Sequence, residues 1–187
     1  VVGDEAGTAL TTGDNNVAIG FEALKTEDAH GFNTAIGYQA LKVQDAGADA
    51  YNTAVGYQAG LDISTGVRNT LIGGTAGTNL TTGGENVAIG YGALFTDDLG
   101  SHNVAVGVSA LQNQNFATAT DSHNTAVGFS AGLSVTTGIQ NTLIGGLAGD
   151  ALTDADYNVA IGYIALTSDT LGSRSVAIGR GTLEVQN

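Results

Sequence analysis

The stretch Asn16-Val17-Ala18-Ile19-Gly20-Phe21-Glu22-Ala23-Leu24 decides the fold, because near-copies of this nonapeptide occur eleven times along the 187-residue chain. A short, nearly fixed period is typical of stacked coils in which each repeat contacts its neighbours. The sequence therefore predicts an all-β parallel β-solenoid of about eleven coils. Eight of the ten steps between the central glycines of the copies are 17 residues long, and the others are 19 and 21: Gly3, Gly20, Gly37, Gly56, Gly73, Gly90, Gly107, Gly128, Gly145, Gly162 and Gly179.

A longer period lies above the coil. The Leu-Thr-Thr-Gly segment at residues 10–13 recurs at residues 80–83, so four coils form one block that is then duplicated. We expect residues 1–187 to form one solenoid domain with blocks at 1–69, 70–141 and 142–187, the third being shorter. A domain of this kind grows by adding coils and assembles no central pocket.

Position 1 of the nonapeptide is predicted to form a ladder. Stacked coils place equivalent side chains above one another, and an amide carries both hydrogen-bond donors and acceptors. None of these asparagines differs from the rest as a catalytic residue would. Nine copies have asparagine there, and Ser175 takes the place in the last one: Asn16, Asn33, Asn52, Asn69, Asn86, Asn103, Asn124, Asn141 and Asn158.

Positions 2 to 4 are predicted to form a short strand. Side chains alternate between the two faces of a strand, so positions 2 and 4 share one face and position 3 lies on the other. We expect position 4 to supply a dry core column and the small position 3, alanine in eight copies, to let something pack closely. The core column consists of β-branched residues: Ile19, Ile36, Val55, Ile72, Ile89, Val106, Val127, Ile144, Ile161 and Ile178.

Position 5 is always glycine, which tolerates positive φ and lets the chain turn after the strand. The predicted turn glycines are Gly20, Gly37, Gly56, Gly73, Gly90, Gly107, Gly128, Gly145, Gly162 and Gly179.

The bulk of positions 3 and 6 varies together. Position 6 is usually Phe or Tyr, but it is glycine at Gly74 and Gly146, in the coils where position 3 enlarges to Leu71 and Leu143. Close packing conserves volume, so we expect positions 3 and 6 to fill one common space.

The formal charge is −13, from 18 acidic and five basic residues. Binding to a nucleic-acid backbone requires basic residues that neutralise phosphates, so that class of function is disfavoured. Most acidic residues lie in the arcs between nonapeptides, which predicts a solvated acidic outer surface. Whether some acidic arcs hold calcium is left open by the sequence.

No motif predicts a catalytic, cofactor or metal site, and we expect no enzyme activity. The three histidines are His30, His102 and His123, the last two in equivalent Ser-His-Asn turns. A threefold axis would gather such turns into a metal site, although duplicated surface sequence accounts for them as well. The carboxylate pairs at residues 27–28 and 97–98 lie in arcs, where we expect nothing apolar to raise a pKa.

The Asn-Val-Ala-Ile-Gly motif at residues 16–20, 86–90 and 158–162 resembles the head repeats of trimeric autotransporter adhesins. The version at residues 33–41 is similar to repeats of phage tail fibres and related surface fibres. The resemblance spans essentially the whole chain and implies a left-handed parallel β-roll in an intertwined or side-by-side homotrimer. Adhesin heads have shorter coils, so the outer arcs differ, and the motif leaves adhesin and tail fibre undecided.

The expected function is that of a non-catalytic structural and adhesive fibre segment, the head or shaft of an extracellular trimeric adhesin or phage tail fibre. Its partners would be two further copies and an unidentified host-surface or matrix receptor, without nucleic acid or membrane insertion. Its place would be the cell surface or the virion. The alternative is a self-polymerising extracellular filament, because Val1 lies inside a coil and Asn187 just past one, which would leave β edges open at both ends.

Overall fold

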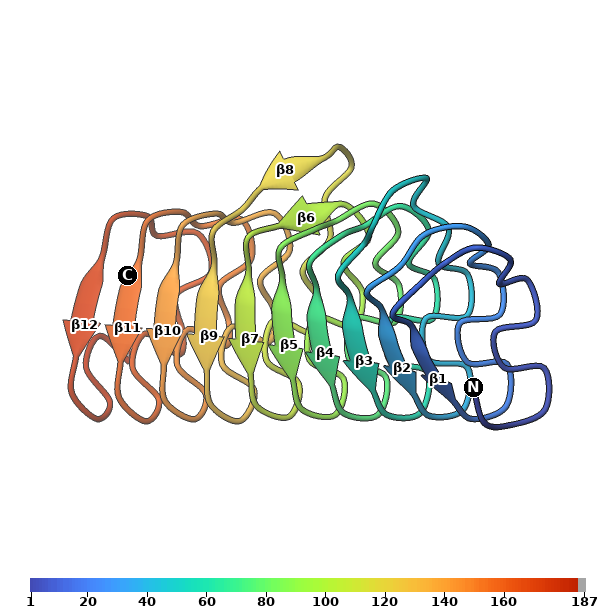
Figure 1. The fold of residues 1–187 in the computed structure, drawn as a ribbon. Coiled ribbons are helices and arrows are strands. Elements are labelled where there is room, and N and C mark those ends of the chain that lie inside the picture. Colours follow the sequence, from blue (N-terminus) through green and yellow to red (C-terminus); the bar gives the residue numbers. More distant parts are fainter. Residues whose placement is uncertain (185–187) are drawn as a thin grey trace.

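The computed structural model describes residues 1–184 as a parallel β-solenoid, as predicted (Figure 1). In this part of the chain ten strands form one parallel sheet in the order β1-β2-β3-β4-β5-β7-β9-β10-β11-β12. Residues 1–184 contain no helix that is long and apolar enough to cross a membrane. The strands of the main sheet are β1 (Val17–Ile19), β2 (Thr34–Ile36), β3 (Thr53–Val55), β4 (Thr70–Ile72), β5 (Val87–Ile89), β7 (Val104–Val106), β9 (Thr125–Val127), β10 (Thr142–Ile144), β11 (Val159–Ile161) and β12 (Val176–Ile178).

The strands pair in register, each residue opposite its counterpart in the next coil. Val17 pairs with Thr34, and Ile161 pairs with Ile178. The first nonapeptide copy contributes only one bridge, from Val2 to Ile19, so the described sheet has ten strands for eleven copies. Figure 1 shows the strands side by side along the solenoid, with β1 and β12 at opposite ends.

The two long arcs differ in shape from the short ones. The arc at 112–123 carries β8 (Thr120–Asp121), which pairs in parallel with β6 (Gly100–Ser101) of the preceding arc. This two-stranded sheet stands above the main sheet in Figure 1. The inserted residues therefore enlarge the outer surface and leave the register of the strands unchanged.

The turn glycines stack tightly on one another. From Gly20 to Gly179 their φ angles lie between 122° and 144°, a region that side-chain-bearing residues rarely adopt. A Cβ added at Gly107 would lie 2.2 Å from the carbonyl oxygen of Gly128, its counterpart in the next coil. Both the backbone angle and the close approach therefore require glycine.

The core lies on the opposite strand face from the one that we predicted. In every strand of the main sheet the middle residue, position 3, is buried, and the residues on either side of it are half-buried or exposed. The narrow interior of the coil accommodates alanine at position 3 of most coils and at position 8, with a buried leucine at position 9 of five coils. The predicted core column is therefore wrong for the single chain, since these position 4 side chains lie on the outer face: Ile19, Ile36, Val55, Ile72, Ile89, Val106, Val127, Ile144, Ile161 and Ile178.

The volume exchange that we predicted between positions 3 and 6 instead joins positions 3 and 9. Leu71 is fully buried, and its Cδ2 would lie 2.8 Å from a Cβ added at Gly77, position 9 of the same coil. Coils with alanine at position 3, such as that of Ala88, mostly have a buried leucine at position 9, here Leu94. Position 6 takes no part because its side chains, such as Tyr91 at 65% exposure, point to solvent.

Candidate functional site

The ladder asparagines form one column next to the strands. The Oδ1 of each accepts a hydrogen bond from the backbone N–H of the position 1 residue in the next coil, at 2.8–3.1 Å from Asn16 through to Ser175. Six of the Nδ2 groups also donate to a backbone carbonyl, as Asn69 does to Gly83 at 3.0 Å. The sequence suggested bonds between amides, but the main donor is the backbone. All but Asn16 are fully buried, so the column fixes the stacking of the coils.

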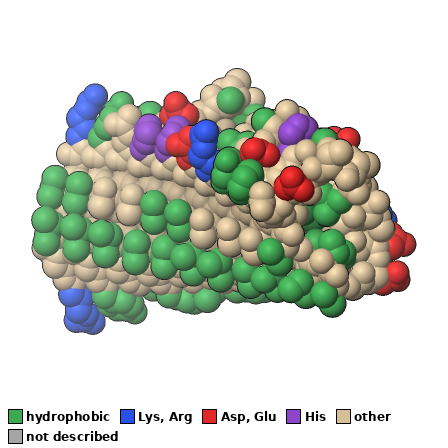
Figure 2. Space-filling model, viewed as in Figure 1, with side chains coloured by type: hydrophobic (Ala, Val, Ile, Leu, Met, Phe, Trp, Pro, Cys, Tyr) green, Lys and Arg blue, Asp and Glu red, His purple; other side chains and the backbone are tan. Residues whose placement is uncertain are grey.

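The outer face of the main sheet is an exposed apolar surface made by positions 2 and 4. No residue at either position is charged. Ile72 and Ile144 are 39% and 38% exposed, and Val176 and Ile178 at the last strand are both 64% exposed. Figure 2 shows hydrophobic side chains in rows along this face, while most charged side chains lie beyond the strands. An exposed, uncharged band of valine, isoleucine and threonine side chains of this kind is typical of an interaction surface.

A column of aromatic side chains follows the turn glycines. Phe21 stacks on Tyr38, and Tyr38 stacks on Tyr57, each with ring centroids 5.3 Å apart. Farther along, Tyr91 and Phe129 are 65% and 62% exposed. These rings extend the apolar surface past the edge of the strands, and each remains partly exposed to solvent.

A surface hollow of about 290 Å³ lies at this aromatic column. Its lining includes the rings of Tyr91 and Phe95 and the amides of Gln58 and Gln112. Rings beside hydrogen-bonding amides make a surface suited to a polar ligand with an apolar face, and the hollow is the chain's candidate contact point for such a ligand.

Both lysines of the chain belong to one network around Glu22. Lys25 and Lys42 place their Nζ atoms 2.6 and 2.7 Å from its two carboxylate oxygens, and Gln39 donates to it at 2.7 Å. The hydrogen bond from Lys25, followed by those from Lys42 and Gln39, lowers the pKa of Glu22 to about 2. The same contact with Glu22 raises the pKa of Lys25, which also pairs with Glu5. The network links successive coils on the outer surface.

The carboxylate pairs in the arcs are not uniformly solvated, which corrects our expectation. Glu27 and Asp97 are both fully buried. Burial raises the pKa of Asp97 to about 6, against the opposing effect of hydrogen bonds from Gln114 and Gly100. Burial also raises the pKa of Glu27. The first residue of each pair thus points inward from its arc.

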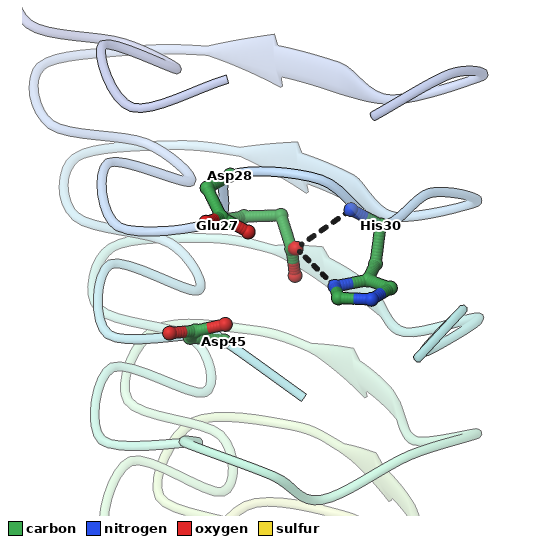
Figure 3. A group of neighbouring side chains, drawn as sticks. All are labelled: Glu27, Asp28, His30 and Asp45. Atoms are coloured by element: carbon green, nitrogen blue, oxygen red, sulfur yellow. Dashed lines mark hydrogen bonds and ion pairs between the residues drawn. The ribbon is translucent and has the colours of Figure 1, made fainter. Parts of the chain in front are cut away.

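Four of the arc side chains form a cluster that the sequence analysis missed. Glu27, Asp28, His30 and Asp45 each place one ligand-type atom within 4.8 Å of the others. Glu27 Oε1 accepts a hydrogen bond from the backbone N–H of His30 at 3.1 Å and lies 3.4 Å from His30 Nδ1. Figure 3 shows the Glu27 carboxylate beside the His30 ring, with Asp45 on the next coil. The available signal was Glu-Asp-x-His followed by an aspartate about one coil later.

The other two histidines come together at a different place. The rings of His102 and His123 stack with centroids 4.8 Å apart. His102 Nε2 lies 3.2 Å from Glu85 Oε2, and its Nδ1 lies 3.2 Å from Asp121 Oδ1. The equivalent Ser-His-Asn turns are therefore neighbours in space, on the outer arcs of adjacent coils.

Comparisons with known proteins find no match: no family model matches the chain, and no curated protein and no solved structure is significantly similar to it.

Proposed function

We propose that this chain is a non-catalytic structural and adhesive segment of an extracellular fibre, the head or shaft of a trimeric adhesin or of a phage tail fibre. The unbroken stack of in-register coils is the observation that carries this function. Ten strands spaced by about 4.8 Å make a rod of about 45 Å, and more coils lengthen it without changing its cross-section. Its interior holds alanine and leucine side chains, as a spacer requires.

The apolar outer face of the sheet supports a homotrimer. The small residues at position 3, which we expected to let something pack closely, do not supply the contact between chains, because Ala18, Ala88 and their counterparts are buried inside the coil. The uncharged columns at positions 2 and 4 are the surface that needs covering. Three such faces packed around one axis remove them from water, at a gain of about 25 cal/mol per Å² of apolar surface.

The arcs and the aromatic column remain on the outside of such a trimer and are the proposed contact surface for a cell-surface or matrix receptor. The net charge of −13 disfavours nucleic acid as the partner. The site of action is the cell surface or the virion.

A charge placed on the outer face tests this function. Val104 lies in β7 near the middle of the sheet, and V104E should separate the chains because it would bury a carboxylate against apolar neighbours. L171E is the matched control, since Leu171 lies in an arc at 66% exposure. Sedimentation velocity should give three-chain particles for the wild type and L171E, and single chains with unchanged circular dichroism for V104E. Equal masses for all three proteins would refute the proposed interface.

A further inference from the structure

We propose that Glu27, Asp28, His30 and Asp45 bind one divalent transition-metal ion per chain, of a kind that accepts both imidazole nitrogen and carboxylate oxygen, such as Zn²⁺. The four side chains come from two adjacent coils and converge on one point (Figure 3). The inference does not depend on the oligomeric state, because one chain supplies all four residues.

The buried carboxylate of Glu27 points to a cation. Its side chain is 0% exposed, and its Oε1 is engaged by His30. Within residues 1–184, its Oε2 is buried and has no hydrogen-bond partner. A buried carboxylate oxygen without a donor is unfavourable unless a positive charge compensates it. Lys25 and Lys42 are paired with Glu22, so neither lysine neutralises the Glu27 carboxylate. A cation bound by the cluster would compensate this buried charge.

The second block shows how the same place is satisfied without a metal. Asp97 occupies the position of Glu27, 70 residues on, and its Oδ2 accepts a hydrogen bond of 2.6 Å from Gln114. Gln44 stands where Gln114 does, but its Nε2 donates to the backbone carbonyl of Ser64 at 3.3 Å instead. In the first block the equivalent glutamine therefore leaves Oε2 of the buried acid without a hydrogen bond.

The two blocks also differ at two of the three remaining ligand positions, while Asp98 keeps the place of Asp28. Gly100 replaces His30, and Asn115 replaces Asp45, so the second block has neither the imidazole nor the carboxylate from the next coil. The blocks therefore differ in the hydrogen bond of Gln44, at His30 and at Asp45, and all three differences surround one buried carboxylate. A surface arc that is merely solvated gives no reason for this grouping. The first block thus places His30 and Asp45 around its buried acid, whereas in the second block the shared glutamine donates to the buried acid instead.

The geometry fits one ion after a small closing movement. Zn–O and Zn–N bonds are about 2.0–2.2 Å, so two atoms bound to one zinc ion lie at most about 4.4 Å apart. The four ligand atoms already lie within 4.8 Å of one another. Asp28 and Asp45 are exposed and free to adjust, whereas Glu27 is held in place by burial. The imidazole nitrogen favours a transition metal over calcium, which prefers oxygen ligands alone.

Isothermal titration of the full chain with ZnCl₂ tests the site. The wild type should bind one Zn²⁺ per chain, and the H30G/D45N variant should bind it at least about tenfold more weakly. The exchanged positions then carry glycine, as at Gly100, and asparagine, as at Asn115, both of which the repeat tolerates. H102A/H123A removes the other two histidines and should leave the affinity unchanged.

Two further measurements separate binding from folding. E27Q should raise the melting temperature of the metal-free protein, because it removes an uncompensated charge. E27Q should also abolish the increase in melting temperature that Zn²⁺ produces in the wild type. Zn²⁺ binding that is equal in the wild type, E27Q and H30G/D45N would overturn the proposal. Loss of Zn²⁺ binding only in H102A/H123A would also overturn the proposal. So would a site that binds Ca²⁺ more tightly than Zn²⁺ and whose affinity for Ca²⁺ is unchanged in H30G.

Discussion

Leu71 and Gly77 share one volume inside the solenoid, and exchanging their bulk tests how the core is packed. Leu71 is fully buried, so L71A should cost about 3–5 kcal/mol in unfolding free energy through lost burial and a residual cavity. G77L alone should cost about 2–4 kcal/mol. Its Cβ would lie 2.8 Å from Leu71 Cδ2 and 3.0 Å from Leu80 Cδ1, which overpacks the core, and Gly77 has a φ of 56°.

The double variant L71A/G77L should lose less unfolding free energy than the sum of the losses caused by the two single changes. It removes the side chain that obstructs a leucine at position 9 and recreates the arrangement of Ala88 and Leu94, where Leu94 is buried at a φ of 51°. We expect a favourable coupling of about 3 kcal/mol between the two changes. Equilibrium urea unfolding of the four proteins, followed by far-UV circular dichroism, measures it.

Additive losses would refute this account of the core, because they would mean that positions 3 and 9 do not fill a common space. A negligible effect of L71A would refute it more simply. L171A serves as the control, since Leu171 is 66% exposed and its truncation should change the unfolding free energy by less than about 0.5 kcal/mol.

Three further outcomes follow from the ladder, the buried acid and the turn column. N86A should lower the unfolding free energy, measured by urea denaturation, by about 2–4 kcal/mol. The reason is that Asn86 Oδ1 accepts a hydrogen bond from the backbone N–H of Asn103 at 2.9 Å in a buried site. A loss below about 1 kcal/mol would contradict the stabilising role of the ladder. Burial raises the pKa of Asp97 from 3.8 to about 6, so the folded state binds this proton more tightly and stability falls as pH rises through that range. D97N does not titrate there, and its stability relative to the wild type should improve by about 2 kcal/mol between about pH 4 and pH 7. Parallel pH profiles would contradict the assignment. G107A should lower the melting temperature far more than G47A. A Cβ at Gly107 would lie 2.2 Å from a carbonyl oxygen, whereas a Cβ at Gly47 would have no atom within 4 Å. Equal decreases in melting temperature would show that the turn glycines are not close-packed.

The repeat made the strands and their register predictable. A glycine at a fixed place in every nonapeptide marks the end of each strand, and the strands at Val17–Ile19 and Val159–Ile161 lie where the pattern indicates. Insertions of two and four residues fall in the arcs at residues 42–51 and 112–123, so they leave the stacking unchanged.

The direction of the strand faces was not predictable from hydrophobicity. Alternation in Val17-Ala18-Ile19 defines two faces, and the larger apolar residues would ordinarily face the core. The interior of a 17-residue coil is so narrow that Ala18 fits inside it, and Val17 and Ile19 then lie outside. Large apolar side chains on the outer face are explained if another chain covers them. The sequence of a single chain does not show how copies assemble.

The buried acids escaped sequence analysis because their environment depends on how each arc folds. Glu27 and Asp28 are neighbours in sequence, yet the first is buried and the second is exposed. Asp45 joins them only because the coils stack, which brings residues about one period apart into contact. Polar clusters in a solenoid are therefore better sought one coil apart than within one arc.

The solution mass of the wild-type chain, determined by size-exclusion chromatography with light scattering over a range of concentrations, tests the proposed fibre assembly most directly. The account predicts three times 18.6 kDa, independent of concentration, since the apolar sheet faces close on one another. A stable mass of 18.6 kDa would contradict it, because the outer face would then remain in water. Growth into ever larger species with concentration would contradict the closed trimer as well and would favour a filament that stacks end to end.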